Sequence, residues 1–135
     1  MGQEYNQSLR TAAHRHLQSA KHLFDTHRKD VAGYLFGIAA ECALKQIMID
    51  SGMRPLAVEQ RRDDPFFAHF EGLKTSLRDS ASGRHSGKLL RFVKDTAFMQ
   101  HWDVSMRYSD GRQILEGWVT RWRDNADLIV TEMDT

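Results

Sequence analysis

This sequence has few prolines, one cysteine and almost no net charge. Its 135 residues include two prolines, Pro55 and Pro65, so nearly all of the chain is free to be helical. The one cysteine, Cys42, has no partner for an internal disulfide and lies in the apolar stretch 38–44, where a small buried side chain is expected. With 19 Lys and Arg against 18 Asp and Glu, the net charge is +1. No global field therefore attracts nucleic acid or an acidic membrane, and any phosphate contact must be local.

Long hydrophobic runs are missing as well. No stretch approaches the roughly 18 uninterrupted apolar residues of a membrane-spanning helix, and residues 1–10 lack an apolar segment after a basic start. We therefore expect a cytoplasmic protein with no membrane partner.

The apolar side chains that are present recur at the period of an α-helix and never alternate as they would in a strand. The expected helices cover residues 7–27, 31–51, 65–80 and 86–101, with a last helix that follows Asp110 and carries an apolar seam from Leu115 to Met133. The sequence therefore predicts an all-α fold: one domain over residues 1–135, a compact bundle of about five helices in which the first two form a long antiparallel pair.

Several boundary signals support these limits. Asp30 is placed to cap the second helix, Gly52 is a suitable left-handed stop, and Asp64 followed by Pro65 is typical of a helix start. Asp110 with Gln113 resembles a capping box for the last helix. Residues 53–64 and 102–111 show no period and are expected to be loops.

Metal and cofactor motifs are not found in the sequence. None of the seven histidines forms an i,i+4 pair and no second cysteine assists them, so neither a zinc site nor another cofactor is predicted. The glycines of Gly33–Gly37 lie inside a helix and indicate close packing rather than a phosphate loop. No G-x-S-x-G nucleophile elbow occurs.

Two charged residues interrupt the otherwise apolar second helix. Glu41 and Lys45 lie one turn apart on a face shared with Tyr34 and Ile38. This stripe is either a solvent edge with an ordinary ion pair or a polar site within the bundle. In the second case Glu41 accepts hydrogen bonds from an arginine of a neighbouring element.

The candidate arginine is Arg107, and it lies in a dense cluster with Trp102, Asp103, Tyr108 and Asp110. The cluster is either a structural connection, in which Trp102 and Tyr108 fill gaps in the core, or a binding site. We predict that Glu41 holds Arg107 and that Trp102 and Tyr108 form the walls of the site.

The sequence resembles HEPN domains, which are compact helical bundles of toxin-antitoxin and phage-defence systems. The resemblance rests on the second helix AGYLFGIAAECALKQIM, on His69 with Leu73, and on the segment WDVSMRY before the last helix. It implies a homodimer and, in the nuclease members, an arginine followed four to six residues later by a histidine. Arg107 matches the arginine and Glu41 the polar residue of the second helix. The positions where the histidine should stand hold Arg112, Gln113 and Ile114.

The resemblance therefore implies a single HEPN-like domain over residues 1–135 that binds nucleotide, RNA or a protein partner, such as a cognate antitoxin or a neighbouring-gene product, without the standard catalysis. Two alternatives stay open. One is a metal-independent endoribonuclease that uses Arg107 and Glu41, with Tyr108 or a histidine from elsewhere. The other is a purely structural or interaction subunit.

Overall fold

The computed structural model describes residues 5–80 and 87–135, and within these ranges the chain is helical with no strand. The α-helices are α1 (Leu9–Asp25), α2 (Lys29–Asp50), α3 (Gly72–Ser80), α4 (Gly87–Lys94) and α5 (Glu116–Met133). Shorter 3-10 segments are η1 (Val58–Asp63), η2 (Pro65–Phe67) and η3 (Val104–Tyr108). The predicted all-α class is confirmed.

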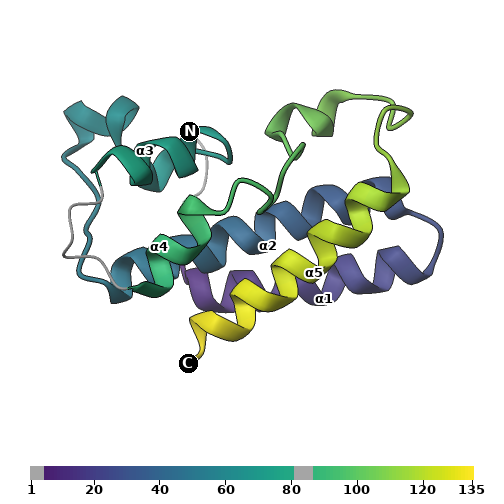
Figure 1. Cartoon of the computed structure of the whole chain (residues 1–135), viewed down its shortest axis with the longest axis horizontal. Helices are drawn as coiled ribbons and strands as arrows, with labels where there is room; N and C mark the ends of the chain where they lie inside the picture. The colour runs from purple at the N-terminus through teal and green to yellow at the C-terminus, as the bar shows by residue number, and fades with distance from the viewer. Residues whose placement is uncertain (1–4, 81–86) are drawn as a thin grey trace.

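The three long helices form the body of the bundle, with α1 antiparallel to α2 and α5 packed across the pair (Figure 1). Polar contacts tie their ends together. At one end, Arg10 of α1 donates to the carbonyl oxygen of Met133 at 3.1 Å. At the other, the Lys29 ammonium pairs with the Glu116 carboxylate at 2.5 Å, which joins the starts of α2 and α5. The predicted antiparallel helix pair is thus the framework of the fold.

Helix α2 lies at the centre of the core. Its buried side chains include Phe36, Leu44, Ile47 and Met48, and α1, α5 and α4 all contact it. It is the one described helix whose length and composition would allow it to cross a membrane, but 61% of that window is buried inside the bundle. Gly52, with φ +98°, ends the helix as expected.

The predicted third helix, over residues 65–80, is wrong in its first half. Asp64 and Pro65 open only the short segment η2, in which the Asp64 carboxylate accepts a hydrogen bond from the Phe66 backbone. The chain then turns through Glu71, whose φ of 44° is left-handed, before α3 begins. The backbone N–H of Phe70 donates to the Glu41 carboxylate and so cannot join an α-helical ladder.

The predicted fourth helix is too long. Its expected first residue, 86, lies outside the described residues, and α4 ends at Lys94 instead of continuing to 101. The following turns are held by contacts distant in sequence. The Lys74 ammonium donates to the carbonyls of Asp95 and Phe98, and Asn125 of α5 accepts from the Met99 backbone.

Two predicted caps are also wrong. Asp30 lies in the first turn of α2, after an N-cap at Arg28, and its carboxylate binds the Arg28 guanidinium at 3.2 Å. Asp110 accepts from the Arg112 backbone in a local turn, whereas α5 starts later, after Leu115.

Candidate functional site

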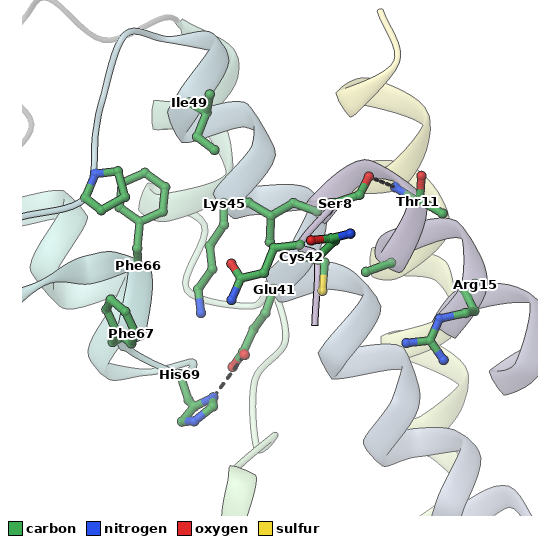
Figure 2. A pocket seen from close by; sticks show the side chains of 15 residues that line it. Ser8, Thr11, Arg15, Glu41, Cys42, Lys45, Ile49, Phe66, Phe67 and His69 are labelled. Carbon is green, nitrogen blue, oxygen red and sulfur yellow. Dashed lines mark hydrogen bonds and ion pairs between the residues drawn. The ribbon is translucent and has the colours of Figure 1, made fainter. Parts of the chain in front are cut away.

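Glu41 is a buried carboxylate on α2, with 4% of its surface exposed. One oxygen accepts a hydrogen bond from the Phe70 backbone at 2.9 Å, and the other lies 3.0 Å from Nδ1 of His69 (Figure 2). Because a carboxylate is an acceptor, Nδ1 of His69 carries the hydrogen, and in the neutral tautomer with this hydrogen Nε2 is the acceptor atom of the ring. Glu41 thus fixes both the start of α3 and the orientation of an imidazole.

His69 combines this buried anchor with an open face, since 43% of its side chain is exposed. It lies in the turn between η2 and α3, and it is close enough to Asp103 to act on that carboxyl. The pKa of Asp103 is lowered, first by hydrogen bonds from Ser105 and to a smaller degree by His69. A carboxylate-held histidine near a cavity is an arrangement suited to accepting or donating a proton.

The predicted contact between Glu41 and Arg107 is wrong. Both residues are described, and no hydrogen bond or ion pair joins them. Arg107 instead donates to the Tyr34 hydroxyl at 3.4 Å. Tyr34 stands seven residues before Glu41 on α2, which is about 10 Å along the helix axis at 1.5 Å per residue. Each carboxylate oxygen contacts a group from the α3 side, and the arginine lies two turns away.

Arg107 is an exposed cation without a carboxylate partner in the described structure. Its guanidinium lies over the ring of Tyr108 at 5.1 Å from the centroid, and the Tyr34 hydroxyl raises its pKa further. Tyr108 is 81% exposed and so does not wall an enclosed site, contrary to the prediction. Together these two residues form an open cationic and aromatic surface on η3.

Trp102 is a core residue, which agrees with the interpretation of the cluster as a structural connection. Its indole N–H donates to the carbonyl of Gly33 at 3.1 Å, and its ring stacks on Tyr34 at 5.8 Å. A Cβ at Gly37 would lie 1.9 Å from the Trp102 ring, so this close approach requires glycine. The predicted close packing at Gly33 and Gly37 is confirmed, with tryptophan rings as the partners.

Both aspartates of the cluster, Asp103 and Asp110, accept hydrogen bonds from nearby backbone N–H groups. Asp103 caps η3 by accepting from the Ser105 backbone at 2.8 Å, and Asp110 accepts from the Arg112 backbone at 3.0 Å. Asp110 also lies 3.7 Å from the Arg112 guanidinium. Neither carboxylate binds Arg107, so neither compensates the charge of its guanidinium.

Lys45 belongs to a different place, a cavity of about 680 Å³ between α1, α2 and the segment that contains η2. Figure 2 shows its side chain running from α2 between Phe66 and Glu41. The residues that line the cavity are Asn6, Gln7, Ser8, Leu9, Thr11, Ala12, Arg15, Glu41, Cys42, Lys45, Ile49, Pro55, Phe66, Phe67 and His69. The Glu41–Lys45 ion pair of the solvent-edge interpretation is not formed, although the two charges are neighbours within this cavity.

Comparisons with protein-family models, with curated proteins and with solved structures found no match to this chain. Its site is interpreted from its own geometry.

The sequence interpretation missed three contributors. His69 had been noted, but nothing in the spacing indicated that it would reach Glu41, 28 residues away. Tyr34 was seen only as a neighbour on the same helical face. Arg15 lies on the polar side of α1, where an exposed arginine is ordinary, so no sequence signal separated it from a solvated residue.

Proposed function

We propose that the chain is a HEPN-like helical module that binds RNA or a nucleotide through Arg107 and Tyr108, as part of a toxin-antitoxin, defence or stress system. The observation that carries this proposal is the exposed Arg107 guanidinium, which has no acidic partner and lies beside an exposed aromatic ring. An arginine contacts phosphate through several N–H donors, and a tyrosine gives a base a surface on which to stack.

The electrostatics support a local contact of this kind. The net charge of +1 leaves no broad basic face, so affinity must come from a few placed groups. Arg107 is such a group because the Tyr34 hydroxyl orients it without neutralising it.

Binding of a fluorescently labelled single-stranded RNA, followed by anisotropy, tests the proposal. Tyr108→Ala should weaken binding roughly tenfold, since stacking on one aromatic side chain contributes about 1–3 kcal/mol. Arg107→Ala should weaken it and flatten its salt dependence, since one counterion contact is lost. The matched control is Arg91→Ala, an exposed arginine already paired with Glu132 at 2.9 Å.

Equal affinity of the Arg107→Ala and Arg91→Ala proteins would contradict the proposal. Absence of RNA binding, together with stable co-purification with the product of a neighbouring gene, would favour the interaction subunit instead.

A second candidate function, metal-independent endoribonuclease activity, is favoured by the Glu41–His69 pair. The Nε2 of a neutral His69 is suited to take the proton of a ribose 2′-hydroxyl that attacks the neighbouring phosphate, from which the 5′-oxygen leaves, while Arg107, two helical turns from Glu41, would bind another phosphate of the same RNA. Here His69 would fill the role of the histidine that is absent after Arg107. RNA cleavage in the presence of a chelator should then be lost in His69→Ala, while RNA binding persists.

Growth arrest on expression, relieved by His69→Ala or Arg107→Ala, would support the enzyme. Unchanged cleavage in His69→Ala would exclude the histidine from the reaction. The proposed setting is the cytoplasm, and pairing of two copies is a further proposal that rests on the family resemblance.

A further inference from the structure

A cavity separate from the Arg107 surface has features of a ligand site of its own. It has a volume of about 680 Å³ and lies between the start of α1, the second half of α2 and the segment around η2. Its walls are largely apolar, with contributions from Leu9, Ile49, Pro55 and Phe66. A space of this size and lining is typical of sites for small organic molecules.

Two cations, Lys45 and Arg15, line this cavity. Neither Lys45 nor Arg15 has a hydrogen bond or ion pair with any described residue. Lys45 is partly buried, and burial lowers the pKa of its ammonium, while the neighbouring Glu41 carboxylate opposes that shift. A partly buried ammonium without a hydrogen-bond acceptor is costly, so a bound anion would stabilise it.

The one buried carboxylate on the cavity cannot fill this role. Glu41 directs its two oxygens to Phe70 and His69, and neither oxygen makes a hydrogen bond or ion pair with Lys45. A second buried carboxylate, Asp64, also acts on the pKa of Lys45, but its two oxygens accept from the backbones of Leu56 and Phe66, and it does not line the cavity. Figure 2 shows Cys42 between the two cations, and both act on the pKa of its thiol, which burial raises.

We propose that this cavity binds a small organic anion with an apolar body. The apolar part lies against Phe66 and Ile49, and the anionic group meets the Lys45 ammonium, with Arg15 adding to the positive potential. This inference is independent of RNA binding by Arg107, because the two sites share no residue.

The probe is 2-naphthoate, whose flat apolar rings carry one carboxylate, and it is compared with the neutral, nearly isosteric 2-naphthamide and with acetate. Calorimetric titration should show naphthoate binding at least about tenfold more tightly than either, since a charge-assisted contact and the apolar body are both needed. In Lys45→Met the affinity for naphthoate should fall to that for naphthamide. The control, Lys94→Met, removes an exposed lysine of α4 and should leave binding unchanged.

Cys42 provides a second measurement that does not depend on the Lys45 variant folding. It is the one cysteine in the chain and lines the cavity, so naphthoate should slow its alkylation by N-ethylmaleimide in the unmodified protein, and acetate should not. Equal affinities for naphthoate and naphthamide, equal effects of Lys45→Met and Lys94→Met, or unchanged alkylation would each overturn the proposal.

Discussion

Glu41 stabilises the fold through hydrogen-bond partners that lie outside its own helix. It is buried on α2, yet both of its oxygens serve residues of the α3 side, Phe70 and His69. A buried carboxylate with two hydrogen bonds is stable in place, whereas its removal leaves a buried backbone N–H without an acceptor. The residue therefore joins two elements and orients a histidine at the same time.

Replacement of Glu41 tests this role. We expect Glu41→Ala to lower the free energy of unfolding by about 2–3 kcal/mol, since hydrogen bonds to a charged group are lost and the Phe70 N–H is left unsatisfied. Glu41→Gln keeps one acceptor oxygen and should cost less. Urea unfolding measures both, with the exposed Glu59→Ala as the control. A cost for Glu41→Ala no larger than that for Glu59→Ala would contradict the assigned contacts.

Asp134 gives the fold a dependence on acid pH. Hydrogen bonds from His14 and Arg10 lower the pKa of its carboxyl from the ordinary value of 3.8. A carboxyl with a lower pKa in the folded than in the unfolded state contributes stability above its unfolded pKa, and this is lost as the pH falls through the folded pKa. The free energy of unfolding should thus decrease below a pH of about 4, and less steeply in Asp134→Asn. Parallel pH profiles for the two proteins would refute this linkage.

At the scale of elements, the close fit between α2 and two tryptophans positions the Arg107 surface. Trp102 fills the space left by Gly37 and stacks on Tyr34, whose hydroxyl in turn meets Arg107. Trp122 of α5 similarly occupies the space at Gly33. The arginine is therefore positioned through a chain of packed rings that begins at a glycine of the central helix.

Gly37→Ala should break this arrangement. The new Cβ would lie 1.9 Å from the Trp102 ring, so the ring must move and the packing is lost. Overpacking of this kind costs about 1–3 kcal/mol or more, and RNA binding by Arg107 should weaken with it. Gly72→Ala is the control, because nothing lies within 4 Å of a Cβ there. Thermal unfolding measures the Tm of both variants, and equal Tm values would contradict the prediction.

At the scale of the whole molecule, one chain covers its own central helix. The sequence-based reason for a homodimer was that α2 is apolar on more faces than a small bundle can cover. In the structure Phe36, Leu44 and Met48 are all fully buried within the single chain. That reason does not hold, and the proposed dimer depends on a surface other than the apolar face of α2.

Sedimentation velocity at micromolar concentration tests the dimer. If two copies pair around Arg107, as the family resemblance implies, the dimer should dissociate in Arg107→Ala and persist in Arg91→Ala. A monomer in the unmodified protein would remove the homodimer from the proposed function and would leave the RNA surface to be tested separately.

The sequence by itself determined the helical class, the long pair α1 and α2, and the central position of α2. These features follow from the local periodicity of apolar residues, which is present in the chain before any long-range contact forms. It also identified Glu41 and Arg107 as charged residues, on or near the apolar central helix, that require a polar partner. The start of α3, the end of α4 and the start of α5 were not predictable in this way, because contacts or turns outside the helical pattern override it there.

Only the tertiary structure decided which groups meet. Arg107 was the expected partner of Glu41 because a carboxylate near an arginine usually pairs with it. The folded chain instead brings His69 and the Phe70 backbone to Glu41, whereas the arginine contacts Tyr34, two helical turns away, and does not reach the carboxylate. The cavity around Lys45 likewise exists only because α1, α2 and the η2 segment converge, and no spacing within one helix encodes that convergence.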